Sequence, residues 1–116
     1  MLLYDFPDHY KGDYWEGVPS IILKRDDVPV DLTNAIVRMQ FKLRATAEPV
    51  LELSTTNGGI VIISAASGEI SIIGRNLDIF AQTYHYDLQY IIPSIATDYT
   101  QTVLAGKLKV ISDITY

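Results

Sequence analysis

The sequence predicts an all-β protein, an antiparallel β-sandwich of immunoglobulin-like or jelly-roll-like type with one short helix near residues 75–81. Two observations favour this class. Apolar and polar residues alternate strictly within residues 35–45, and many short apolar segments are separated by turn residues. A chain of 116 residues is expected to form a single domain with one core. The pattern leaves open whether the sheets form a sandwich or a partly closed barrel.

Residues 35–45 (AIVRMQFKLRA) give the clearest strand. A period of two places one set of side chains on a buried face and the other set on an exposed face. The predicted buried set is Val37, Met39, Phe41 and Leu43. The opposite face carries the cations Arg38, Lys42 and Arg44, for which a plain solvated face and a contact with an acidic partner are the two interpretations.

The remaining strands are shorter and are bounded by turn residues. They are predicted at 19–25, 28–32, 50–54, 60–63, 69–73, 84–92 and 102–115. An acidic turn is expected at Asp26–Asp27, and Asn57, Gly58 and Gly59 can supply the positive φ angles of a tight reversal. Gly106 predicts a bulge or turn within the last strand.

One segment, residues 74–82 (GRNLDIFAQ), has helical spacing. Leu77, Phe80 and Ala81 repeat at i, i+3 and i+4, and Asn76 is available as an N-cap. A helix of one or two turns is therefore predicted here.

Residues 1–16 differ in composition and are predicted to form an N-terminal aromatic and acidic arm, ahead of a single β-sandwich domain at 17–116. The arm holds five of the twelve aromatic residues (eight Tyr, three Phe and one Trp in the whole chain). These candidate partner-binding residues are Tyr4, Phe6, Tyr10, Tyr14 and Trp15. Either the segment is an ordinary first strand and loop, or its aromatic side chains dock on a neighbouring subunit.

The stretch YHYDLQY (84–90) contains the one tempting catalytic pair. His85 and Asp87 lie two residues apart, so on a strand both side chains point to the same face. No nucleophile at a recognisable spacing completes a catalytic set. The segment is therefore predicted to be a sheet strand, with Tyr84, Tyr86 and Leu88 facing inward and no catalytic residue.

Metal and cofactor sites are not predicted either. His9 and His85 lie far apart and make no metal-binding motif. The cluster of Asp26, Asp27 and Asp31 lacks the spacing of a calcium loop. The glycines of TNGGIV precede a strand and are not followed by lysine, which excludes a phosphate-binding loop.

Bulk composition narrows the classes of partner. A net charge of −5 argues against nucleic-acid binding, which needs clustered cations. The absence of cysteine excludes disulfides and predicts folding in a reducing cytosol. The apolar runs are much shorter than the roughly 20 residues that span a bilayer, and the start is not typical of a secretory signal, so no membrane association is expected.

An ordered series of motifs carries a family resemblance. These are KGDYW (11–15), PVDLT (29–33), LELSTTNGGIVI (51–62), YHYDLQY (84–90) and AGKLKVISDIT (105–115). In this order they resemble the small β-sandwich domain of tailed-bacteriophage tail and baseplate proteins, including the N-terminal domain of baseplate upper proteins. The similarity spans residues 11–115.

The resemblance implies a non-catalytic structural protein of a bacteriophage or prophage virion, located in a tail, baseplate or connector. It implies no cofactor, and it implies binding to other virion proteins and to copies of itself as a homo-oligomer. Such a protein is made and folded in the host cytoplasm before it joins the virion. The alternative is a carbohydrate-binding module whose exposed Tyr or Trp side chains stack on glycans of a host surface.

Overall fold

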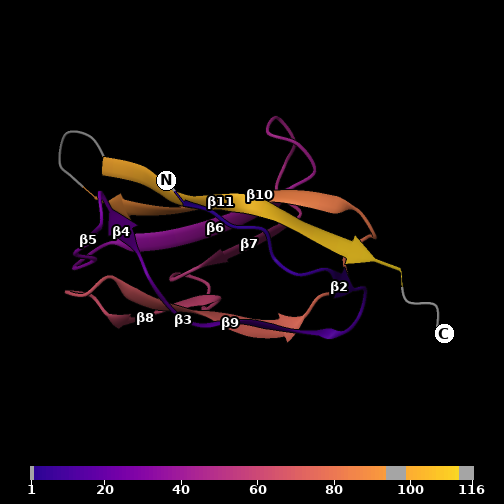
Figure 1. Cartoon of the computed structure of the whole chain (residues 1–116), viewed down its shortest axis with the longest axis horizontal. Coiled ribbons are helices and arrows are strands. Elements are labelled where there is room, and N and C mark those ends of the chain that lie inside the picture. Colours follow the sequence, from indigo (N-terminus) through magenta and orange to yellow (C-terminus); the bar gives the residue numbers. More distant parts are fainter. Residues whose placement is uncertain (1, 94–98, 113–116) are drawn as a thin grey trace.

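The computed structural model describes residues 2–93 and 99–112, and within these ranges every regular element is a strand (Figure 1). The strands are β1 (Leu2–Leu3), β2 (His9–Tyr10), β3 (Tyr14–Ile22), β4 (Lys24–Arg25), β5 (Val28–Pro29), β6 (Ile36–Lys42), β7 (Leu51–Ser54), β8 (Ile60–Ser64), β9 (Glu69–Asn76), β10 (Thr83–Ile92) and β11 (Tyr99–Ile111). The all-β prediction is confirmed.

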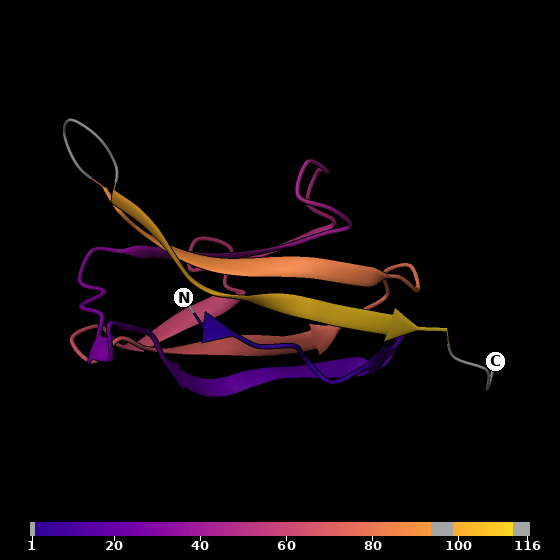
Figure 2. The same ribbon diagram turned by 45° about the horizontal axis from the view of Figure 1, so that its top comes forward.

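The larger sheet has the strand order β1-β11-β10-β6-β7, and β2 also pairs with β11. Strand β10 is antiparallel to both β11 and β6, and β6 is antiparallel to β7. The short β1 and β2 run parallel to β11, so this sheet is mixed. The prediction of a purely antiparallel arrangement is therefore wrong for this sheet. It curls like half a barrel over the smaller sheet, which forms the lower layer in Figure 1 and in the turned view of Figure 2.

The smaller sheet is antiparallel, with the order β3-β9-β8. Beside it, β4 and β5 form a hairpin closed by Asp26 and Asp27, which have φ angles of 53° and 64°. Two successive positive φ angles are those of the two-residue hairpin turn that matches the twist of the strands. The predicted acidic turn at Asp26–Asp27 is confirmed.

The core lies between the two layers and is mainly aliphatic and aromatic. On β6 the alternation is confirmed, since Val37, Met39 and Phe41 are fully buried. Leu43, predicted to join them, is 45% exposed because β6 ends at Lys42. On β10 the predicted inward residues Tyr84, Tyr86 and Leu88 are all buried, whereas His85 is exposed.

The helix predicted near residues 75–81 is wrong. Strand β9 continues to Asn76, and Leu77 then pairs with the N-terminal segment, because Gly12 N donates to Leu77 O (2.7 Å) and Leu77 N donates to Asp13 O (3.1 Å). These long-range bonds occupy backbone groups that a helix would use locally. Leu77 is buried while Phe80 is 80% exposed, so their spacing did not mark one common face.

In the described ranges there is no helix with the length and hydropathy needed to cross a membrane.

Gly106 is not at a bulge, contrary to the prediction. It lies in regular register opposite Tyr86, and the register shift in this strand pair falls farther along, between Leu88 and Gln89. A Cβ added to Gly106 would collide with the carbonyl oxygen of Tyr4. Glycine is needed here because the N-terminal segment crosses β11 in direct contact with its backbone.

Candidate interaction surface

The N-terminal segment forms one edge of the larger sheet. Tyr4 N donates to Ala105 O (2.8 Å), Phe6 N donates to Lys107 O (2.9 Å), and Lys107 N donates to the carboxylate of Asp5 (3.0 Å). Together with β1 and β2, these bonds place the segment along β11 (Figure 2). Its course is that of a first strand and loop laid on the domain, and β3 runs across the boundary predicted at residue 16.

Two of the five aromatic residues predicted to bind a partner are buried inside the chain. Phe6 and Trp15 are each 7% exposed, and their rings meet edge to face at 5.4 Å. Phe6 also packs on Tyr86 at 4.9 Å, and Trp15 meets Phe41 at 6.1 Å. Such aromatic pairs contribute about 0.5–1.5 kcal/mol beyond their buried area. In the folded chain Phe6 and Trp15 therefore stabilise the core.

The other three aromatic residues of the segment are accessible. Tyr4, Tyr10 and Tyr14 are 46%, 51% and 61% exposed. The ring of Tyr4 still contacts Phe6 edge to face at 5.2 Å, which limits its rotation. The partner-binding role stays a prediction for all five residues, and these three present the surface on which it can be tested.

His85 and Asp87 lie on the outer face of the larger sheet. His85 is opposite Lys42 on β6 and Lys107 on β11. His85 and Asp87 line a shallow depression together with Gln40 and Lys42. Between the described residues no hydrogen bond joins His85 to Asp87, and no group of three or more His, Asp or Glu side chains is placed to hold a metal ion. This face has the arrangement of a solvated sheet surface.

The buried tyrosines of β10 act as hydrogen-bond donors. Tyr84 Oη donates to Phe80 O (2.7 Å), and Tyr86 Oη donates to Tyr4 O (2.5 Å). Burial raises the pKa of both hydroxyls, and for Tyr86 the neighbouring Tyr4 and Asp5 raise the pKa further. These neutral phenols fix two non-strand segments to the sheet.

His9, the second histidine, is only 8% exposed. Its Nε2 donates to Asp13 O (3.0 Å). This bond closes the short connection between β2 and β3, which is a structural role that the sequence pattern did not reveal.

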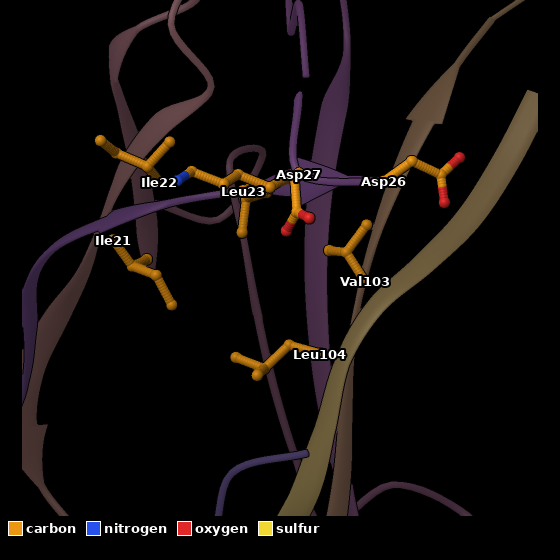
Figure 3. Close-up of a pocket in the computed structure, with 8 residues that line it drawn as sticks. Ile21, Ile22, Leu23, Asp26, Asp27, Val103 and Leu104 are labelled. Atoms are coloured by element: carbon orange, nitrogen blue, oxygen red, sulfur yellow. The ribbon is translucent and has the colours of Figure 1, made fainter. Parts of the chain in front are cut away.

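A hollow of about 380 Å³ lies between β3 and β11, beside the β4–β5 turn (Figure 3). Ile21, Leu23, Val103 and Leu104 give it an aliphatic wall, and the carboxylate of Asp27 lies near its rim. Ligand pockets combine apolar walls with several convergent polar groups. The charged residues of this lining are Lys24, Asp26 and Asp27, and in Figure 3 the two carboxylates lie on either side of Val103 and do not point to one place.

Strand edges are also possible binding surfaces, because an edge strand exposes backbone N–H and C=O groups that have no partner in the sheet. The edge of β7 is closed by a side chain. Asn57 Nδ2 donates to Glu52 O (2.9 Å), and Asn57 Oδ1 accepts from Ser54 N (2.9 Å). Asn57 thus takes the place of a neighbouring strand.

The edge formed by β3 is irregular. Pro19 has no N–H to offer, and the pairing with β9 shifts between Val18 and Ile21. Gly17 has a φ of 69°, which bends the strand further. Proline and bulges are devices that prevent another strand from adding to an edge.

The edge of β8 has none of these devices. Along an antiparallel pair, hydrogen-bonded and non-hydrogen-bonded positions alternate. Ile73 N donates to Gly59 O (2.9 Å), so Gly59 is at a hydrogen-bonded position. The backbone N–H and C=O groups of Ile60 and Ile62 therefore point away from β9. In the described part of the chain nothing bonds to these outward groups. The strand contains no proline, glycine or charge, and Val61 and Ile63 are 46% and 52% exposed.

No family model, no curated protein and no solved structure matches the chain.

An open, aliphatic strand edge can take up an extended segment through main-chain hydrogen bonds. From the sequence, residues 60–63 were expected only to form a strand. Whether a strand is central or at an edge depends on which neighbours pair with it, and that is decided by contacts distant in sequence.

Proposed function

We propose that the chain is a non-catalytic structural protein of a bacteriophage or prophage virion, built into a tail, baseplate or connector. It acts by binding copies of itself and other virion proteins. The observation that carries this proposal is the open edge of β8, with its outward backbone groups at Ile60 and Ile62. The ordered motifs from KGDYW to AGKLKVISDIT support the virion role by their resemblance to tail and baseplate domains. As part of this proposal, the curled larger sheet and the smaller antiparallel sheet would be a variant of the immunoglobulin-like or jelly-roll-like sandwich of such domains.

Exposed tyrosines supply a second contact surface in this proposal. Tyr4, Tyr10 and Tyr14 belong to the N-terminal segment and to the start of β3. Tyrosine is enriched at protein interfaces because it combines a large apolar ring with a hydroxyl that can donate. A stable contact buries about 800 Å² on each partner, so more than one strand edge is needed in an assembled particle.

Protein mass spectrometry of purified particles tests the virion role. Particles are collected from a culture that expresses the chain from its natural locus, and copies of the chain per particle are compared with those of the major structural proteins. A fixed number of copies per particle, retained through density-gradient purification, is the expected result. Recovery of the chain only from the particle-free fraction would overturn the proposal.

The alternative function is a carbohydrate-binding module, and the exposure of Tyr10 and Tyr14 is the observation that favours it. Exposed aromatic rings can stack on the faces of sugar rings. A glycan array distinguishes the two functions, since saturable binding that is lost in the double variant Tyr10→Ala/Tyr14→Ala supports the module. A chain that binds no glycan and is present in particles supports the structural role.

A further inference from the structure

Strand β8 lies within an uncharged part of a charged chain. Residues 53–68 contain no Asp, Glu, Lys or Arg, although 20% of all residues are charged. Among the described strands longer than two residues, β8 is the one without a charged side chain. The net charge of −5 opposes contact between copies elsewhere, but this region adds no repulsion.

The edge also defines the chemistry of the segment that can bind there. The occupant must be extended, to satisfy the outward N–H and C=O groups of Ile60 and Ile62, and aliphatic, to cover the exposed side chains of Val61 and Ile63. Strand β8 itself meets both requirements. Antiparallel pairing of identical strands about a two-fold axis is self-complementary.

We propose that β8 binds β8 of a second copy of this chain in an antiparallel pair, which joins the two smaller sheets into one continuous sheet. The inference rests on the self-binding of the proposed function and names the strand that performs it. In this dimer Ile60 exchanges two hydrogen bonds with Ile62 of the second copy, and Ile62 does the same with Ile60 of the second copy. Only backbone groups that already point outward are used.

This register places Val61 on the two-fold axis. The two Val61 residues form a non-hydrogen-bonded pair, in which the Cα atoms of facing residues are about 4.5 Å apart. The register shift in β8 falls between Ile62 and Ser64, outside the paired residues. On the same outer face Ile73, 41% exposed, lies on β9 and therefore one strand away from the contact.

Two charge variants form a matched test by sedimentation velocity or light scattering at submillimolar to millimolar concentration. Val61→Lys places a cation at the axis, whereas Ile73→Lys places the same side chain on the same face beyond the contact. We expect the wild type and I73K to have twice the chain mass of 13.0 kDa and V61K to have the monomer mass. Circular dichroism of all three chains serves as the check on folding, and we expect all three to be folded because both positions are exposed.

The absence of cysteine makes a second test simple. Val61→Cys is expected to form a disulfide-linked dimer on mild oxidation, because a disulfide needs a Cα separation of roughly 4.4–6.8 Å and the proposed pair meets it. Ile73→Cys is expected to remain largely unlinked under the same conditions. A monomeric wild type, a V61K variant that dimerises like the wild type, or no preference for linkage at residue 61 would each overturn the proposal.

The outcome is separable from that of the virion role. Dimerisation through β8 in a chain that is missing from particles refutes the virion role and leaves the β8 contact in place. If the chain is found in particles but its V61K variant still dimerises, the β8 contact is refuted and the virion role is not.

Discussion

Gly106 lies directly against the carbonyl group of Tyr4. A Cβ on residue 106 would overlap the Tyr4 carbonyl oxygen and approach its carbonyl carbon to 2.6 Å. The same carbonyl oxygen accepts the hydrogen bond from Tyr86 Oη. The contact therefore joins the first residues of the chain to β10 and β11, and it makes the position of the N-terminal segment dependent on a residue far along the sequence.

Gly106→Ala is expected to displace the N-terminal segment. The variant loses the bonds that Tyr4 makes to Ala105 and Tyr86, and overpacking adds strain, so we expect a fall of about 2–4 kcal/mol in the free energy of unfolding. Urea denaturation measures this fall, and faster chymotrypsin cleavage after Tyr4 or Phe6 reports release of the segment.

Gly58→Ala is the control for this variant. Gly58 has a φ of 81° but no atom within 4 Å of an added Cβ, so only backbone strain of about 1 kcal/mol is expected. Chymotrypsin should cleave the Gly58→Ala variant after Tyr4 or Phe6 at the same rate as it cleaves the wild type. If the two variants release the segment equally, the contact between Gly106 and Tyr4 does not hold it in place.

Asn57 is expected to contribute more to the free energy of unfolding than an ordinary exposed residue does. Its side chain forms hydrogen bonds with the backbone of Glu52, Ser54 and Gly59. Asn57→Ala removes these bonds, and we expect a loss of about 1–3 kcal/mol in thermal or urea unfolding. Asn57→Asp keeps the acceptor oxygen but loses the donor to Glu52 O, so an intermediate loss is expected. Equal stability of all three chains would contradict the capping role.

Much of the strand pattern followed from local sequence. The alternation of Val37, Met39 and Phe41 fixes which face of β6 is buried, because side-chain direction along a strand depends on local geometry. Likewise Asp26 and Asp27 form the predicted turn. These features depend on neighbours in the chain, which a single sequence displays.

The errors came from contacts distant in sequence. Leu77 and Phe80 have helical spacing, yet Leu77 bonds to Gly12 and Asp13. The need for Gly106 arises from Tyr4, about one hundred residues earlier, and the burial of Trp15 arises from Phe6 and Phe41. The open edge of β8 is likewise visible only when the partners of every strand are known.

Asp27→Gly is expected to stabilise the β4–β5 hairpin. Asp27 has a φ of 64°, which is unfavourable for an L-residue by about 1–2 kcal/mol and unstrained for glycine. The greater entropy of glycine in the unfolded chain offsets part of this gain, so we expect a net rise of about 0.5 kcal/mol, measured as a small increase in melting temperature.

Asp8→Gly serves as the control, because Asp8 is exposed and outside any strand and is not among the residues with positive φ. That substitution should be neutral or slightly destabilising. A lower melting temperature for Asp27→Gly than for the wild type would show that the aspartate side chain contributes more than the strain of its backbone costs.

Tyr86→Phe is expected to change the response of stability to alkaline pH. The pKa of the Tyr86 hydroxyl is raised in the folded chain by burial and by the nearby Tyr4 and Asp5. In the unfolded chain it is about 10, so above that pH the unfolded state loses this proton while the folded state keeps it. The wild type therefore loses stability as pH rises beyond about 10. The variant has no such proton, although at neutral pH it lacks the bond to Tyr4 O and is about 1 kcal/mol less stable.

The difference in unfolding free energy between the two chains should consequently shrink between pH 8 and pH 11 in urea titrations. Burial also raises the pKa of Tyr84. Tyr84 is present in both chains, so its effect on the unfolding free energy cancels in the comparison. Tyr10→Phe provides the matched control, because it removes a hydroxyl from a side chain that is 51% exposed and leaves the bond from Tyr86 Oη to Tyr4 O in place. If the difference between the wild type and Tyr86→Phe stays constant over this range, Tyr86 ionises as easily in the folded chain as in the unfolded one, and its hydroxyl is not held as a buried donor to the N-terminal segment.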